Sequence, residues 1–158
     1  MHRMKKVSLM ILNGRMANAS SLKRGKIQMS NWTHVAAIFR IDHFRIDGQM
    51  KDFTKIFGRE VNGFDTRYVW LEADEHPERF LPCGSEGTLK MHVWTNPNPC
   101  SMAAYTVSIF GDLRDHDDAD EIISWFQKKC KELGDSIRQA VITVENEQYG
   151  MQTKTYMG

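Results

Sequence analysis

The sequence predicts a small α+β domain built on one antiparallel sheet. Four segments alternate between apolar and polar residues, the period-two pattern typical of strands, and two segments repeat apolar residues at helical spacing. Their order along the chain is strand, helix, strand, strand, helix, strand. A chain of 158 residues, 41% of them hydrophobic, suits a single globular domain.

The first strand is predicted over residues 34–42 (HVAAIFRID), where one face carries only apolar side chains. Residues 49–57 predict a short helix with Phe53, Ile56 and Phe57 on one side. Gly58 suits the position just after the end of this helix, since glycine readily adopts the left-handed conformation found there.

A long insert, residues 59–87, precedes the second strand. Within it, residues 68–71 (YVWL) predict a short strand, because aromatic and β-branched residues favour strands. Residues 84–87 (GSEG) predict a turn and not a phosphate-binding loop, because a strand follows them where such a loop needs a helix. A connection of this length is usually functional or only partly ordered.

Residues 88–95 and 102–113 predict the second and third strands. The sequence Asn-Pro-Asn-Pro at residues 96–99 ends the first of these and turns the chain into a hairpin.

Residues 117–133 predict the longer helix, with Asp117 or Asp118 as its N-cap and Gly134 after its end. Its predicted buried stripe consists of Ile122, Ile123, Phe126, Cys130 and Leu133. Residues 137–144 predict the last strand, and the polar residues after it are expected to fray.

This order of elements is that of the ferredoxin-like βαββαβ fold, a four-stranded antiparallel sheet with two helices on one face. The domain is expected to span residues 29–146. A basic tail at residues 1–28 would precede it, and a polar tail at residues 147–158 would follow it.

Charge divides the chain into two unlike parts. Residues 1–28 contain seven of the 21 Lys and Arg residues and none of the 20 Asp and Glu residues, which leaves 14 basic and 20 acidic residues from Met29 onward. Four interpretations of the basic segment stay open: a secretory signal within residues 1–19, an organelle transit peptide, a nucleic-acid-binding arm, and an untranslated stretch before a true start at Met29.

The cellular location of the protein can be predicted from the cysteines and from the basic segment. Cys83, Cys100 and Cys130 are odd in number and form no Cys-x-x-Cys pair, which favours reduced thiols in a bacterial cytoplasm over disulfides or a zinc site. The protein would be secreted if residues 1–19 were a signal peptide. No apolar stretch approaches the ~18 residues of a membrane helix, so we expect no membrane association.

Three segments resemble known proteins: residues 29–32 (MSNW) at the start of the first strand, residues 84–87 (GSEG) and residues 104–114 (AYTVSIFGDLR). They are similar to segments of small uncharacterised proteins of bacteriophages and mobile elements that carry a ferredoxin-like domain. The resemblance implies a phage or prophage origin and assigns no activity and no functional residues.

The sheet face opposite the helices is a candidate nucleic-acid site. The predicted strands place there two aromatic residues, a histidine and two cations, namely Arg40, Lys90, His92, Trp94 and Phe110. Stacking rings with flanking cations are what binding of a single strand requires. Against this, the aromatic motif of RNA-recognition domains is absent from the third strand, and the body of the protein is acidic.

Carboxylates gather between the third strand and the long helix. Asp112, Asp115 and His116 could bind a divalent cation, although their spacing does not match a calcium-binding loop. The first-turn acids are already explained by helix capping and the helix dipole. Cys83 lies close in sequence to His76 and Glu78, but no nucleophile signature surrounds it.

The leading hypothesis is a non-enzymatic, phage-type protein-interaction module, because the body is acidic and the sequence carries no catalytic or cofactor signature. It would bind a host or phage protein through the insert or an open sheet edge, and a homodimer could form through the same edge. The alternatives are a single-stranded nucleic-acid-binding domain and a metal-dependent hydrolase that uses Asp112, Asp115 and His116.

Overall fold

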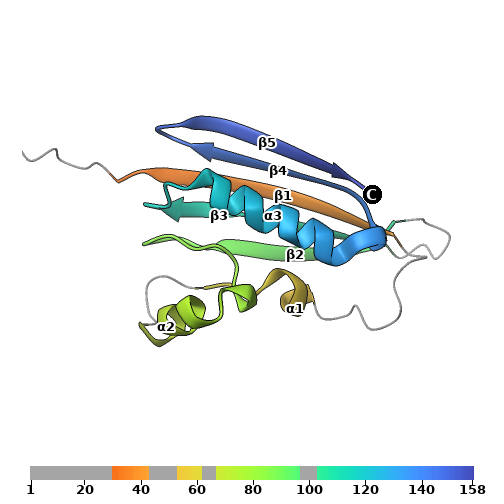
Figure 1. Cartoon of the computed structure of the whole chain (residues 1–158), viewed down its shortest axis with the longest axis horizontal. Coiled ribbons are helices and arrows are strands. Elements are labelled where there is room, and N and C mark those ends of the chain that lie inside the picture. The colour runs from red at the N-terminus through yellow and green to blue at the C-terminus, as the bar shows by residue number, and fades with distance from the viewer. Residues whose placement is uncertain (1–29, 43–52, 62–66, 97–102) are drawn as a thin grey trace, which may run out of the picture.

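The computed structural model describes residues 30–42, 53–61, 67–96 and 103–158. Five strands form one sheet in the order β2-β3-β1-β4-β5, and every neighbouring pair is antiparallel (Figure 1). The strands are β1 (Trp32–Asp42), β2 (Leu89–Thr95), β3 (Ala103–Arg114), β4 (Ile137–Asn146) and β5 (Gly150–Met157). The α-helices are α1 (Phe53–Phe57), α2 (Arg67–Glu75) and α3 (Ala119–Leu133), with 3-10 turns at Pro77–Arg79 and Gly134–Ser136. The basic segment at residues 1–28 lies outside the described residues.

Strand β1 is the centre of the sheet because it pairs with β3 on one side and β4 on the other. Its predicted apolar face is confirmed: Val35, Ala37, Phe39 and Ile41 are buried, and the residues between them are exposed. Alternation of the side chains therefore gives this single strand one face in the core and one face in solvent.

Helix α3 crosses one face of the sheet diagonally (Figure 1). Its start is fixed by Asp118, whose carboxylate accepts hydrogen bonds from the backbone N–H groups of Asp120 and Glu121, each at 3.0 Å. The helix ends before Gly134, which has a φ of +51°. The predicted stripe is largely confirmed, since Ile122, Phe126, Cys130 and Leu133 are buried and Ile123 is half-buried.

In the core, aromatic side chains of helices α1 and α3 pack against the central strand β1. The ring of Phe39 on β1 lies 4.7 Å from that of Phe57 on α1 and 5.1 Å from that of Phe126 on α3. Helix α1 has only five residues and cannot be stable alone, so its position depends on Phe53 and Phe57, which are both buried.

The sheet has five strands and not the four that were predicted, and residues 147–158 are not a frayed tail. A tight turn after β4 returns the chain as β5: the side-chain oxygen of Asn146 accepts hydrogen bonds from the N–H groups of Gln148 and Tyr149, at 2.9 and 3.1 Å. Gly150 supplies the positive φ of +82° that this turn needs. Strand β5 was missed because nearly all of its side chains are exposed, with only Tyr156 packing on the core.

The predicted strand at residues 68–71 is also wrong, because these residues belong to helix α2. The helix packs Ala73 and Val69 against Val61 and Phe80, a small apolar cluster separate from the main core. The guanidinium of Arg59 lies 4.5 Å above the ring of Phe80 and 2.8 Å from the carboxylate of Glu72. These contacts give the insert its own packed structure. Figure 1 shows α1 and α2 on the β2 side of the sheet, away from β5.

The predicted turn at residues 84–87 runs against the end of β3. The N–H of Ser85 donates to the carbonyl of Arg114 at 2.8 Å, and the N–H of Arg114 donates to the carbonyl of Glu86 at 2.9 Å. Gly87 has a φ of +81°, and a Cβ atom there would collide with the carbonyl oxygen of Asp112. The glycine is therefore required by both backbone conformation and space.

None of the helices within the described ranges has the length and hydropathy needed to cross a bilayer.

Replacing one phenylalanine by alanine on each face of the sheet tests which face is buried in the core. Phe39→Ala should reduce the free energy of unfolding by ~3–5 kcal/mol, because it opens a cavity between the sheet and the helices α1 and α3. Phe110→Ala, the matched control on the exposed face, should cost less than ~1 kcal/mol. Urea denaturation monitored by circular dichroism measures both, and equal losses would contradict the assigned faces.

Candidate functional site

The five residues predicted for a nucleic-acid site lie together on the sheet face opposite α3. They occupy alternate positions of β1, β2 and β3, on the face opposite the buried side chains of β1 and β3, and each of them is exposed. We call this set the aromatic patch; its members are Arg40, Lys90, His92, Trp94 and Phe110.

Two rings of the aromatic patch are already stacked. The rings of His92 on β2 and Phe110 on β3 are 5.2 Å apart and only 10° from parallel. Lys90 is the direct cross-strand partner of Phe110, while Trp94 and Arg40 lie on either side of Thr106. Trp94 and Phe110 expose 55% and 47% of their surfaces, so each leaves a flat apolar area in solvent.

The other end of the same sheet face is acidic. Asp112 on β3 and Glu145 on β4 flank His34 on β1, and the Nδ1 atom of His34 lies 2.7 Å from the carboxylate of Asp112. The hydrogen bond and charge of Asp112 raise the pKa of His34, with smaller contributions from Glu145 and Glu147. His34 and Arg40 are six residues apart on β1, so roughly 20 Å separates Arg40 from the acidic end. Lys90 is closer to that end, because its partner Phe110 is only two residues from Asp112 on β3.

The three candidate metal ligands do not converge. Asp112 contacts His34, while the carboxylate of Asp115 accepts a hydrogen bond from the Ser85 hydroxyl at 2.7 Å and lies 3.7 Å from Arg114. His116 points elsewhere, toward the carbonyl of Cys83. Within the described ranges, no three His, Cys, Asp or Glu side chains are grouped closely enough to bind a metal ion.

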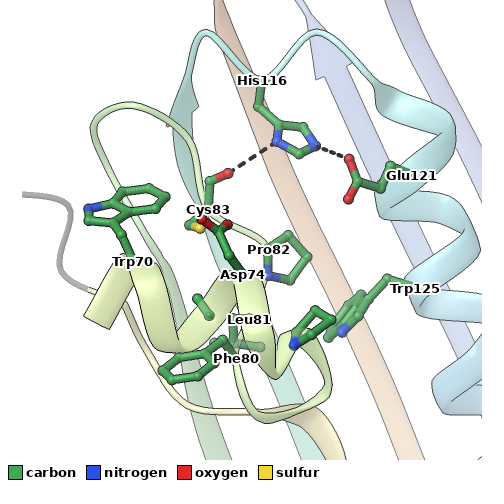
Figure 2. A pocket seen from close by; sticks show the side chains of 11 residues that line it. Trp70, Asp74, Phe80, Leu81, Pro82, Cys83, His116, Glu121 and Trp125 are labelled. Carbon is green, nitrogen blue, oxygen red and sulfur yellow. Dashed lines mark hydrogen bonds and ion pairs between the residues drawn. The ribbon is translucent and has the colours of Figure 1, made fainter. Parts of the chain in front are cut away.

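A pocket of about 420 Å³ lies between the insert and α3, and Figure 2 shows its lining. Trp70 and Asp74 come from α2, Cys83 from the segment before β2, and Glu121 and Trp125 from α3. His116 contacts two of these neighbours. Its Nδ1 atom lies 3.1 Å from the carbonyl oxygen of Cys83, and its Nε2 atom lies 3.7 Å from a carboxylate oxygen of Glu121.

The environment of Cys83 opposes its use as a nucleophile. Burial raises the pKa of the thiol to about 11, with further contributions from the negative charges of Asp74 and Glu121. The thiolate, which is the reactive form, is therefore scarce near neutral pH. The two candidate partners of Cys83 in the sequence, His76 and Glu78, interact with each other: the Nδ1 atom of His76 lies 3.5 Å from the carboxylate of Glu78.

Sequence reasoning missed several residues on both surfaces. Met151 and Met157 lie on the same sheet face as the aromatic patch, because they pair with Glu145 and Gln139 of β4. No apolar alternation in β5 indicates this. In the pocket, Trp70 lies more than 40 positions before His116 and Trp125 in the chain, and only the tertiary structure brings it next to them.

The chain matches no family model and no curated protein. A solved structure of a phage SAM lyase in complex with S-methyl-5'-thioadenosine is similar over 81% of this chain and 90% of that chain, with 9% identity and a TM-score of 0.40. This is a weak structural likeness to a phage protein, and it identifies neither a family nor an activity.

The pair of His34 and Asp112 makes a prediction about titration. Asp112→Asn should lower the pKa of His34 toward the ordinary 6.5, because it removes the acceptor that stabilises the imidazolium. Glu145→Gln should produce a smaller shift in the same direction. An NMR titration of the His34 ring protons measures both, and an unchanged pKa in Asp112→Asn would contradict the contact.

The same pair sets the sign of a stability effect. Since folding raises the pKa of His34, the pair stabilises the folded state fully below the unfolded pKa, and this contribution disappears as the pH rises through the folded pKa. Both side chains are about half exposed, so the contribution should stay below ~1 kcal/mol.

Proposed function

We propose that this protein is a non-catalytic binding module that binds single-stranded nucleic acid through the aromatic patch. The observation that carries the proposal is the stacked pair of His92 and Phe110 beside Trp94, exposed on one face and flanked by Lys90 and Arg40. The spatial order β2-β3-β1-β4 of the first four strands supports a ferredoxin-like domain extended by β5.

Stacking explains why these rings would be exposed. A base has an apolar face, and stacking it on an aromatic side chain removes both surfaces from water. The stacked pair presents one platform and Trp94 presents a second one on the edge strand β2. The patch is therefore sized for a short segment of about two stacked bases, with little sequence preference because every base has a stacking face.

The charges indicate where the backbone of the nucleic acid would lie. Lys90 and Arg40 can each contact a phosphate, whereas Asp112 and Glu145 repel phosphates at the end of the face where His34 lies. Arg40 is the cation farther from these acids, since Lys90 pairs with Phe110, two residues from Asp112. We therefore place the strand over β2 and β3 near Trp94 and away from His34. Two phosphate contacts correspond to a change in log K of only about 1.4 per tenfold change in salt.

Trp94→Ala in the full chain should weaken binding of a labelled oligonucleotide by ~1–3 kcal/mol, because it removes one stacking platform. Fluorescence anisotropy with single-stranded RNA and DNA measures this loss. Tyr68→Ala is the matched control: Tyr68 is a large aromatic residue, 86% exposed, on α2 and off the sheet face. Equal affinities for the wild type and the Trp94 variant would remove the proposal.

A form lacking residues 1–28 separates the patch from the basic segment. Binding that survives the truncation and responds to Trp94→Ala supports the patch. Alternatively, truncation could abolish binding, and the full chain could show a salt dependence much steeper than two phosphate contacts give. That result would assign the affinity to the seven basic residues of the segment.

A phage-type protein-interaction module is the second candidate, and a specific observation favours it. Ile38, Met151 and Met157 are 44%, 68% and 72% exposed on the same face, which extends an apolar surface beyond the aromatic patch. Residues 29–158 carry six more acidic than basic residues, a balance that suits a basic protein partner better than a polyanion. Absence of any oligonucleotide binding, together with weaker capture of a partner protein by Ile38→Asp, would favour this candidate.

A further inference from the structure

The pocket between the insert and α3 has a chemistry unlike that of the sheet face. Its volume of about 420 Å³ falls within the range of roughly 300–1,000 Å³ typical of small-molecule sites. Trp70 and Trp125 lie on opposite sides of it, with His116 and Glu121 above them in Figure 2. The described residues of its lining include the carboxylates of Asp74 and Glu121 and no lysine or arginine.

Two buried nitrogen atoms in this lining, Nε2 of His116 and Nε1 of Trp125, have no hydrogen-bond partner among the residues that the structure describes. Buried polar groups without partners are rare, and each calls for an explanation such as a bound ligand or water. A ligand that formed hydrogen bonds with both nitrogen atoms would remove the free-energy cost of leaving them unpaired.

The proton on His116 can be placed by elimination. A carbonyl oxygen only accepts hydrogen bonds, so Nδ1 of His116 must carry a proton and donate to the carbonyl of Cys83 at 3.1 Å. In the neutral ring, Nε2 is then an acceptor. It faces a carboxylate oxygen of Glu121 at 3.7 Å, which is also an acceptor and is too far for a hydrogen bond. When the ring is neutral, two acceptors therefore lie side by side and define a place for a donor, whereas a protonated ring would itself direct an N–H toward Glu121.

The electrostatic environment selects a cation. Burial is the main cause that raises the pKa of the Cys83 thiol, and the negative charges of Asp74 and Glu121 raise it further. Both carboxylates are exposed to solvent and also line the pocket, so they add negative charge at its wall. The faces of tryptophan side chains attract cations as well, more strongly than those of other aromatic residues.

We propose that this pocket binds a small organic ammonium ion that bears at least one N–H and an aromatic or alkyl body. The N–H group donates to Nε2 of His116 and to the carboxylate of Glu121, while Asp74 adds a second negative charge. The body packs against Trp70 and Trp125, and the Trp125 indole N–H is available to a hydroxyl or carbonyl oxygen on the same ligand.

Three probes of similar size test the chemistry on the full chain: benzylammonium, benzyltrimethylammonium and benzoate. Two-dimensional NMR of the ¹⁵N-labelled protein follows the indole N–H signal of Trp125 up to millimolar probe concentrations. We expect benzylammonium to shift this signal most, benzyltrimethylammonium to bind more weakly because it has no N–H, and benzoate to have no effect.

Glu121→Gln should weaken benzylammonium binding about tenfold or more, because it removes a charged hydrogen-bond acceptor. Asp120→Asn is the matched control, since it removes the same charge one residue earlier on α3 without lining the pocket. Asp74→Asn should also weaken binding, and the spectrum of each variant reports whether it is folded.

Three results would overturn the proposal: no probe shifts the Trp125 signal, benzoate binds as well as benzylammonium, or Asp120→Asn weakens binding as much as Glu121→Gln does. The last result would mean that only the overall negative charge of the helix start attracts the cation. The proposal does not depend on the aromatic patch, so failure of nucleic-acid binding leaves it unaffected.

Discussion

The packing of Phe39 between two helical segments is the interaction on which the rest of the structure depends. Its ring contacts Phe57 of α1 and Phe126 of α3, and it belongs to β1, the strand that is hydrogen-bonded to both β3 and β4. A helix as short as α1 is unstable by itself, so the start of the insert is positioned by this contact. The orientation of α3, which supplies one wall of the pocket, depends on the same cluster of rings.

Backbone alternation then couples the core to the exposed surface. Because Phe39 points inward, Arg40 and Ile38 must point outward. The register of β1 with β3, and of β3 with β2, places Phe110, Lys90 and Trp94 on that same outer face. A shift of one residue in any of these pairings would bury the cations and expose the core. The packing that fixes the register therefore also fixes the arrangement of the aromatic patch.

The pocket depends on a different set of contacts. The segment before β2 is attached to the end of β3 by backbone hydrogen bonds between Ser85, Glu86 and Arg114, with an ion pair between the side chains of Glu86 and Arg114. This attachment brings Cys83 next to His116, in the segment between β3 and α3. The insert is thus joined to the domain at two ends, through α1 at one and through this short ladder at the other.

The sequence predicted those parts of the fold in which periodic burial leaves a local pattern. Strand β1 and helix α3 follow their apolar spacing closely, and Asp118 and Gly134 mark the ends of α3 as their chemistry requires. All five residues of the aromatic patch were predictable, because the alternation that identifies a strand also identifies its outer face. Whether that face binds nucleic acid stays a prediction.

The errors arose where tertiary contacts determine the structure. Residues 68–71 have strand-forming side chains, yet the contacts of Ala73 and Val69 with Val61 and Phe80 favour a helix there. Strand β5 buries almost nothing, so its formation depends on backbone pairing with β4, which has no sequence signature. The pocket needs residues more than 50 positions apart, Trp70 and Trp125, and no local pattern relates them.

Strand β5 also changes which edge the sheet presents to other molecules. Without it, β4 would be the outermost strand, and its buried residues Ala140, Ile142 and Val144 would lie beside a row of unpaired backbone groups. Strand β5 pairs with those groups and places Gln152, Thr153, Lys154 and Thr155 at the margin in their place. Strand β5 therefore moves the sheet edge away from the buried residues of β4 to a strand with a polar centre, although it contributes little to the hydrophobic core.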